Sequence, residues 1–228
     1  MSLVDTLRLS AGNAMEKGIT VLADGRIAER VTYAELYHDA CWVAGALIVR
    51  GVRPGDRVAV ALPNSVDFAR AFFGVLAAGA VAVPLPPPYR FASLDIHVRR
   101  IALALKQSRV RIIATDQTMA GILGPVFAAV DDHFGVVDVA DLADGDFLHA
   151  EVHASSPAMV QYTSGTSGQP KGVVLTHANI LANVAAIIDG LAIGRRDVGC
   201  SWLPLFHDMG LIGHLLVPVV SGSDLAVY

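Results

Sequence analysis

Residues 161–172 read Gln161-Tyr-Thr-Ser-Gly-Thr-Ser-Gly-Gln-Pro-Lys-Gly172, with an apolar run on each side at 158–160 and 173–175. The stretch suits a loop that wraps an anion, because glycines let backbone N–H groups approach a ligand and hydroxyl side chains donate further hydrogen bonds. Lys171 adds a full positive charge and is one of only three lysines in the chain. We therefore expect a phosphate-binding loop between two strands, lined by Thr163, Ser164, Gly165, Thr166, Ser167, Gly168 and Lys171.

Two other interpretations of this stretch account for less of it. A Walker A loop requires glycine where Pro170 stands and serine or threonine where Gly172 stands, so the P-loop NTPase pattern fails at two positions. A Ser/Gly-rich hairpin turn without a ligand would explain the first six residues. It would not explain why Pro-Lys-Gly follows in register.

Along the rest of the chain, strand patterns alternate with helical patterns. This alternation predicts an α/β fold, a doubly wound and mostly parallel sheet with helices on both faces. Ligands of such sheets bind beyond the carboxyl ends of the strands, where the phosphate loop would lie. We expect a hairpin with an Asp24-Gly25 turn at 19–31, strands at 57–62, 80–85, 110–115, 136–139, 198–203 and 226–228, and helices at 32–50, 66–78, 93–108, 117–130 (interrupted at 124–125), 176–190 and 209–219. Thr32 and Glu35 form a Thr-x-x-Glu capping box. Pro63-Asn64-Ser65 ends a strand and caps the helix that follows, and Ser93 caps the next helix.

A second motif, Ser201-Trp-Leu-Pro-Leu-Phe-His-Asp-Met-Gly-Leu-Ile-Gly213, leaves a predicted strand and opens a predicted helix. His207 and Asp208 would suit a hydrolase dyad, but no Gly-x-Ser-x-Gly elbow accompanies them. His207 and His214 lie seven residues apart without a third ligand, which is a weak metal pattern. A buried structural role for His207 remains an alternative on spacing alone.

The two motifs together resemble those of the adenylate-forming superfamily, which includes acyl-CoA synthetases, luciferases, amino-acid adenylation domains and fatty-acyl-AMP ligases. The family pattern of the loop is Thr-Ser-Gly-(Ser/Thr)-Thr-Gly-x-Pro-Lys-Gly, and this chain departs from it only at Ser167, where the hydroxyl is kept. The text from His207 to Gly213, together with Pro-Leu-Pro-Pro-Pro at 84–88, looks specifically like fatty-acyl-AMP ligases.

This resemblance implies an ATP-dependent ligase that converts a fatty acid and ATP to acyl-adenylate and pyrophosphate, with ATP and Mg²⁺ as cofactors. It implies catalytic roles for Lys171, which would hold the β- and γ-phosphates, and for His207, beside the substrate carboxylate and the α-phosphate. It places Thr166 or Ser167 near Mg²⁺. His207, Asp208, Met209, Gly210 and Leu211 are the implied substrate-binding residues.

The resemblance covers nearly the whole chain but only the first part of the family's length. We therefore expect residues 1–228 to be the N-terminal portion of an adenylation domain that is inactive alone. A long-chain acyl-CoA synthetase is the alternative enzyme, and a non-catalytic module that binds acyl chains or a partner is the alternative of another class. By resemblance, the acceptor could be an acyl carrier protein or a polyketide or nonribosomal peptide synthase.

Composition excludes other classes. The net charge is −4 and the basic residues are scattered, which gives nucleic-acid binding no support. The longest uncharged apolar run, 71–83, is shorter than the ~20 residues of a membrane span, and we see no signal peptide. Cys41 and Cys200 are expected to be reduced, in a cytoplasmic protein.

Three further features favour an ordinary structural interpretation. The acidic residues of 138–153 lack the EF-hand spacing, so a solvated loop is expected there rather than a Ca²⁺ site. His149 and His153 lie four residues apart where no helix is indicated, which is a weak metal pattern. The prolines at 86–88 suit a rigid connector better than a docking motif.

Overall fold

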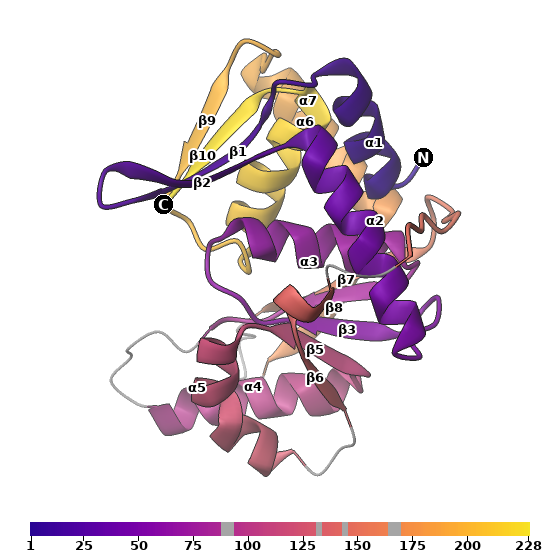
Figure 1. Ribbon diagram of the computed structural model, residues 1–228, viewed down its shortest axis with the longest axis vertical. Coiled ribbons are helices and arrows are strands. Elements are labelled where there is room, and N and C mark those ends of the chain that lie inside the picture. The colour runs from indigo at the N-terminus through magenta and orange to yellow at the C-terminus, as the bar shows by residue number, and fades with distance from the viewer. Residues whose placement is uncertain (88–93, 131–133, 143–145, 164–169) are drawn as a thin grey trace.

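The computed structural model describes residues 1–87, 94–130, 134–142, 146–163 and 170–228. Within these residues the strands form two sheets. The six-stranded sheet has the order β6-β5-β3-β4-β7-β8, and the four-stranded sheet has the order β2-β1-β10-β9 (Figure 1). The strands are β1 (Gly18–Ala23), β2 (Arg26–Thr32), β3 (Arg57–Val60), β4 (Val81–Pro84), β5 (Ile112–Thr115), β6 (Gly135–Asp138), β7 (Pro157–Thr163), β8 (Lys171–Thr176), β9 (Val198–Ser201) and β10 (Asp224–Val227).

Most strand pairs are parallel. In the larger sheet, β6, β5, β3, β4 and β7 pair in parallel and only β8 returns antiparallel, as the partner of β7. In the smaller sheet, β1 and β9 flank β10 in parallel, and β1 forms a hairpin with β2. The predicted α/β fold is thus confirmed. The alternation of strands and helices did not reveal that the strands divide between two sheets, because pairing partners leave no local trace.

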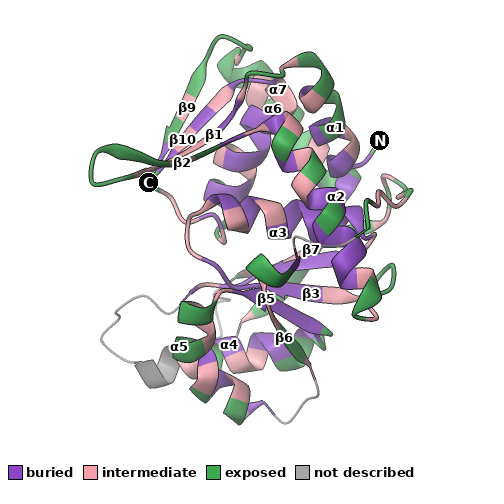
Figure 2. Cartoon of the chain, viewed as in Figure 1, coloured by how far each residue is buried: buried purple, intermediate pink, exposed green. Residues whose placement is uncertain are grey.

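Helices cover both faces of the six-stranded sheet, and Figure 2 shows the burial between these layers. One core cluster joins residues of both sheets with residues of α1, α2, α3, α6 and α7, and another packs α4 and α5 against the opposite face. Alternate residues of β3 serve the two clusters, since Val58 and Val60 face one and Ala59 faces the other. The α-helices are α1 (Leu3–Asn13), α2 (Tyr33–Val49), α3 (Val66–Ala77), α4 (Leu94–Ser108), α5 (Gln117–Ala129), α6 (His177–Leu191) and α7 (Val217–Ser221).

Local sequence signals account for several element boundaries. The predicted capping box of α2 is confirmed, because Thr32 Oγ1 accepts from Glu35 N at 3.2 Å and Glu35 Oε2 accepts from Thr32 N at 2.8 Å. The hairpin turn between β1 and β2 places Asp24 and Gly25 at positive φ, as an Asp-Gly turn requires. Gly79 takes φ 72° just after α3, a conformation that only glycine adopts without strain.

Other boundaries differ from the predictions. Helix α1, capped by Ser2, was not predicted, and α5 continues through Pro125, where an interruption was expected. Pro125 removes one N–H from the helix, and the turns on each side hold it together. The predicted helix at 209–219 is instead a π-helix, η2 (Met209–Leu216), followed by α7, and a short 3₁₀ turn, η1 (Val139–Leu142), follows β6. The predicted cap at Ser93 lies outside the described residues.

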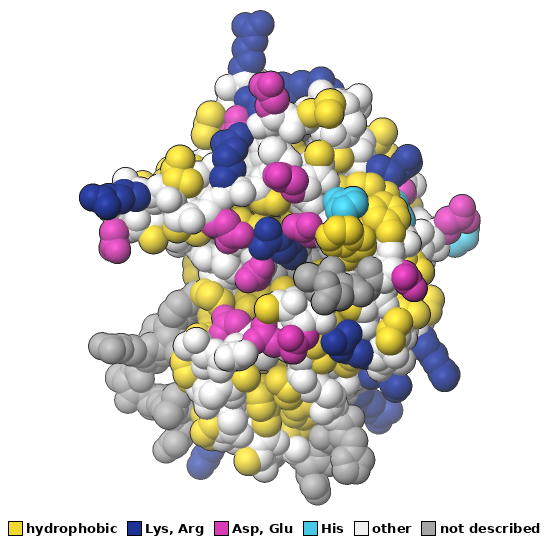
Figure 3. Space-filling view, in the orientation of Figure 1, with side chains coloured by type: hydrophobic (Ala, Val, Ile, Leu, Met, Phe, Trp, Pro, Cys, Tyr) yellow, Lys and Arg dark blue, Asp and Glu magenta, His cyan; other side chains and the backbone are white. Residues whose placement is uncertain are grey.

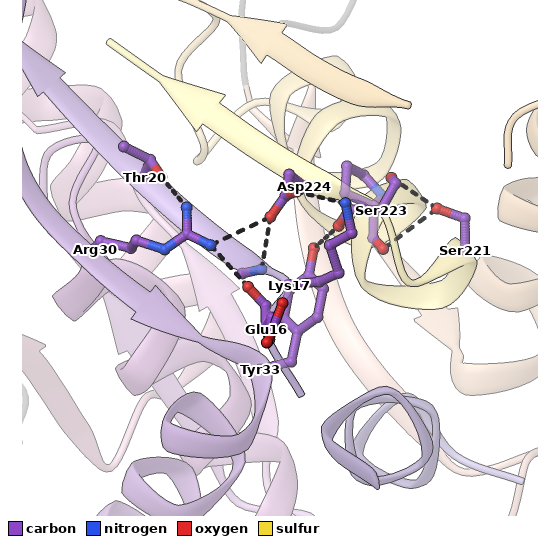
Figure 4. Close-up of polar contacts among 10 residues, drawn as sticks. Glu16, Lys17, Thr20, Arg30, Tyr33, Ser221, Ser223 and Asp224 are labelled. Atoms are coloured by element: carbon purple, nitrogen blue, oxygen red, sulfur yellow. Dashed lines mark hydrogen bonds and ion pairs between the residues drawn. The ribbon is translucent and has the colours of Figure 1, made fainter. Parts of the chain in front are cut away.

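A polar network joins the chain's last strand to its first hairpin (Figure 4). Asp224, which begins β10, pairs with Lys17 at 2.7 Å, and its other oxygen accepts a hydrogen bond from the Gly18 N–H at 3.1 Å. Beside it, the buried Tyr33 hydroxyl donates to the carbonyl of Ser223 at 2.7 Å, and burial raises the pKa of this phenol. These contacts secure the edge between β1 and β10.

Surface chemistry agrees with the dispersed charge of the sequence. In Figure 3, acidic and basic side chains are interspersed over much of the visible face. None of the helices that the structure describes has both the length and the apolar character needed to cross a bilayer. Cys41 is a buried free thiol, and Cys200 is an exposed one.

Candidate functional site

The two strands that flank the phosphate-loop stretch pair as predicted. Strands β7 and β8 pair with Thr163 opposite Lys171 and Tyr162 opposite Gly172. Because β7 runs parallel to β4, its last residue, Thr163, lies at the carboxyl edge of the sheet, where ligands of such folds bind. Lys171 is exposed at the start of β8. The predicted residues Ser164, Gly165, Thr166, Ser167 and Gly168 lie outside the described residues.

Tyr162 anchors this hairpin to helix α4. Its hydroxyl lies 2.7 Å from Ser108 Oγ and donates to the carbonyl of Ala104 at 3.0 Å. Burial raises the pKa of this phenol, so it remains a neutral donor at physiological pH. The ring also crosses the facing strand, where a Cβ on Gly172 would come within 3.2 Å of Tyr162 Cζ and 2.9 Å of Val160 Cγ1. A larger residue at position 172 would force the Val160 or Tyr162 side chain to shift.

The second motif forms an irregular segment between β9 and η2, and the side chain of Asn64 holds it. Asn64 follows β3 and donates through Nδ2 to the carbonyls of Leu203 at 3.0 Å and Tyr228 at 2.8 Å. Its Oδ1 accepts from the N–H of Leu205 at 2.8 Å. From β7, Gln161 Nε2 donates to the carbonyl of Phe206 at 3.2 Å. The side-chain amides of Asn64, which follows β3, and Gln161, on β7, thus hold the backbone of the residues that precede His207.

His207 and Asp208 are bonded to each other at the surface. His207 Nδ1 lies 2.6 Å from Asp208 Oδ1, and the same oxygen accepts from the N–H of Met209 at 2.7 Å. A carboxylate can only accept hydrogen bonds, so Nδ1 carries the proton and Nε2 is the nitrogen left for other contacts. Their side chains are 67% and 59% exposed, which contradicts a buried structural role for His207.

A pocket of about 240 Å³ brings the two motifs together. It lies between the end of β4, helix α4, the β7–β8 hairpin and the segment that carries His207. Thr163 and His207 line it, as does the cationic side chain of Arg100. Its other lining residues are Pro84, Leu85, Pro86, Ile101, Ala104, Gln161, Tyr162, Pro170 and Phe206.

The remaining predicted substrate residues are not among those that line this pocket. Leu211 is fully buried in the larger core cluster, and Met209 is 60% exposed. Gly210 packs directly beneath the 203–204 backbone, where a Cβ would overlap the carbonyl oxygen of Pro204. Substrate-binding roles for Asp208, Met209, Gly210 and Leu211 stay predictions.

Three residues of the site were missed by sequence reasoning. Gln161 stood inside the quoted loop without a role. Asn64 was interpreted as part of a helix start, but Ser65 is the N-cap of α3, which frees Asn64 to reach across to the smaller sheet's connection. Arg100 lies on α4, and nothing in its sequence neighbourhood signals that it reaches the pocket.

The alternative metal patterns gain no geometric support. His149 Nδ1 lies 3.0 Å from the Tyr37 hydroxyl and its Nε2 lies 3.5 Å from Asp5 Oδ1, while burial lowers its pKa. Within the ranges that the structure describes, no three His, Cys, Asp or Glu side chains are grouped so as to hold a metal ion.

Comparison with known proteins decides the family. Residues 10–228 match the family of AMP-binding enzymes. This chain belongs to that family. A long-chain-fatty-acid–AMP ligase, FadD26 of Mycobacterium marinum, is 36% identical over 206 residues, which cover 86% of this chain and 34% of that protein. The chain thus spans about a third of the length of this curated relative.

Solved structures of family members share the fold. One comes from a study of fatty acyl-adenylate ligases from E. coli and L. pneumophila and superposes with a TM-score of 0.91 at 29% identity, covering 99% of this chain and 41% of that one. Another is a fatty acyl-adenylate ligase from L. pneumophila in complex with acyl adenylate and pyrophosphate. It superposes with a TM-score of 0.84 at 28% identity, covering 99% of this chain and 39% of that one.

Proposed function

We propose that this chain forms the phosphate-loop part of an ATP-dependent ligase that activates a fatty acid as its acyl-adenylate. One observation carries the proposal: Thr163 of the hairpin and His207 of the second motif line the same pocket at the carboxyl edge of the sheet, and Lys171 lies opposite Thr163 in the hairpin. Membership of the AMP-binding enzyme family and the similarity to fatty-acid–AMP ligases support the same reaction.

The residues present fit a polyphosphate. Lys171 pairs with Thr163 across the hairpin, which places a cation next to a hydroxyl that lines the pocket, and Arg100 is the cation that lines the pocket itself. No Asp or Glu is among the residues that line the described pocket, so an anion meets no opposing carboxylate there. Mg²⁺, when bound, would neutralise phosphate charge, and we propose Thr166 and Ser167 as the residues nearest to it.

The reaction would be an in-line displacement at phosphorus. A carboxylate oxygen of the fatty acid attacks the α-phosphorus of ATP, the bond between that phosphorus and the bridging oxygen breaks, and pyrophosphate leaves with both electrons. The protein need only position the reactants and stabilise charge. Lys171 and the loop would hold the β- and γ-phosphates, and His207 would lie beside the reacting carboxylate, with its tautomer set by Asp208.

The test is fatty-acid-dependent ATP–pyrophosphate exchange, run on the longest natural form of the gene product and on Lys171→Ala. We expect this variant to lose on the order of 100-fold in kcat, the usual cost of removing one group that stabilises transition-state charge. Lys106→Ala, an exposed lysine of α4 outside the pocket, is the matched control and should retain full activity. Exchange that is unchanged in Lys171→Ala would remove the loop from the mechanism.

The acceptor is a second part of the proposal. We propose transfer of the acyl group to a carrier protein or to a polyketide or nonribosomal peptide synthase, in the cytoplasm. Product analysis with CoA added separates the alternatives, because an acyl-CoA thioester would assign a long-chain acyl-CoA synthetase instead. A folded protein without exchange and without ATP binding would assign a non-catalytic module.

A further inference from the structure

Gln161 occupies an unusual position for an uncharged polar side chain. It lies on β7 two residues before Thr163, on the face that Met159 buries in the larger core, and only 8% of it is exposed. It also lines the pocket with Thr163 and His207. A buried amide at this point costs free energy unless its hydrogen bonds are met, so its position calls for an explanation.

The orientation of this amide is determined by its neighbour. Nε2 donates to the carbonyl oxygen of Phe206 at 3.2 Å, and only the NH₂ group can make that bond. Oε1 must therefore point the other way, where it is buried without a hydrogen-bond partner among the described residues. The amide thus donates its hydrogen bond to a backbone carbonyl, and its acceptor oxygen stays buried.

Asn64, in the connection between β3 and α3, holds the same segment by hydrogen bonds. It holds Leu203 and Leu205 through both of its functional atoms, at 3.0 Å and 2.8 Å, while Gln161 holds Phe206. The next residue is His207, whose N–H bonds back to the carbonyl of Pro204 at 3.0 Å. Residues 202–207 lie outside the helices and strands, so the side-chain bonds from Asn64 and Gln161 add to this one turn bond in holding their backbone.

We propose that Asn64 and Gln161, the amide clamp, are positioning residues of the adenylation reaction: they hold the backbone before His207 so that its imidazole stays at the pocket beside the phosphate loop. The catalytic effect of the amide clamp rests on the proposed function. Neither residue performs chemistry. A misplacement of a reacting group by about 1 Å can cost on the order of 100-fold in rate, so a clamp of this kind affects turnover more than ATP affinity.

The experiment compares wild type with Gln161→Met, which keeps the length of the side chain and removes its hydrogen bonds, and with Asn64→Asp, which keeps the acceptor for Leu205 and removes both donors. Thr115→Val is the matched control. Thr115 is fully buried in the larger sheet and, like the clamp residues, donates to a distant backbone carbonyl, that of Ala61 at 2.8 Å, but it does not line the pocket. Tm is recorded for every variant.

Two readouts are needed. The first is amide hydrogen exchange of the peptide that covers 203–211 in this chain, which does not depend on activity; we expect exchange about ten-fold faster in both clamp variants and unchanged in Thr115→Val. The second is ATP–pyrophosphate exchange in the longest natural form, where we expect kcat to fall about ten-fold or more and KM for ATP to stay within about two-fold.

The outcomes separate the two proposals. Wild type without pyrophosphate exchange refutes the proposed function. If wild type is active and the kcat of both clamp variants lies within about two-fold of the wild-type value, the clamp proposal is overturned and the proposed function stands. Unchanged hydrogen exchange of 203–211 in Gln161→Met also overturns it, whatever the activity. If Gln161→Met fails to fold, Asn64→Asp decides by the same two measurements.

Discussion

Protonation of His177 should destabilise this fold in mild acid. His177 is the first residue of α6, is 1% exposed, and accepts a hydrogen bond through Nδ1 from the N–H of Leu3 at 3.2 Å. The bond joins α6 to α1 across 174 residues of sequence. A protonated imidazole carries hydrogens on both nitrogens, so it cannot accept from Leu3 and must place a charge in the core.

The size of this loss of stability follows from how far the pKa of His177 is lowered. Burial lowers the pKa of His177 from 6.5 to about 4. Below pH 6.5 the unfolded chain binds a proton that the folded chain refuses, so stability is complete above pH 6.5, falls between pH 6.5 and about 4, and falls no further from this cause below that range. This lowering of the pKa corresponds to a loss on the order of 3 kcal/mol in the free energy of unfolding.

The assay is urea unfolding at pH 7.5, 6.0, 5.0 and 4.5 for wild type and His177→Asn. Asparagine places an oxygen where Nδ1 stands and does not take up a proton in this range. The free energy of unfolding of His177→Asn should therefore fall by up to about 3 kcal/mol less than that of wild type between pH 7.5 and pH 4.5. His153→Asn, at an exposed histidine, should follow wild type. Parallel pH dependence of wild type and His177→Asn would refute the reasoning, because the buried imidazole would then not be the group that titrates.

Two other substitutions test the packing of the site and the closure of the smaller sheet. Gly210→Ala should reduce activity and lower the free energy of unfolding by about 1–3 kcal/mol, because its Cβ would overlap the carbonyl of Pro204. Gly213→Ala, whose Cβ would meet only the flexible Met209 Sδ at 3.2 Å, should be tolerated, and equal effects in the two would contradict this account. Asp224→Asn should lower stability by about 1 kcal/mol in urea unfolding, because it weakens the pair with Lys17 at 2.7 Å; an effect that persists unchanged at high salt would argue against the ion pair.

Much of the site's chemistry was predictable from short stretches. The hairpin of β7 and β8 was expected, because strand patterns on either side of a glycine-rich stretch are properties of neighbouring residues. The cap at Thr32 and the turn at Asp24 were predicted for the same reason. The exposure of His207 was not predicted, and a buried His207 had been left open. The substrate-binding roles of Met209, Gly210 and Leu211 rested on resemblance, and only placement in the fold shows that Leu211 belongs to the core.

By itself, the sequence determined the α/β class, the cap at Thr32, the turn at Asp24 and the hairpin of β7 and β8, because each depends on interactions within a few residues. Only the tertiary structure decided that β1 pairs with β10, that α1 docks on His177, and that Asn64 and Gln161 hold the segment before His207. These contacts join residues far apart in the chain. A buried amide or imidazole that meets a distant backbone group has no periodic signature, so its partner is known only once the strands and helices have packed.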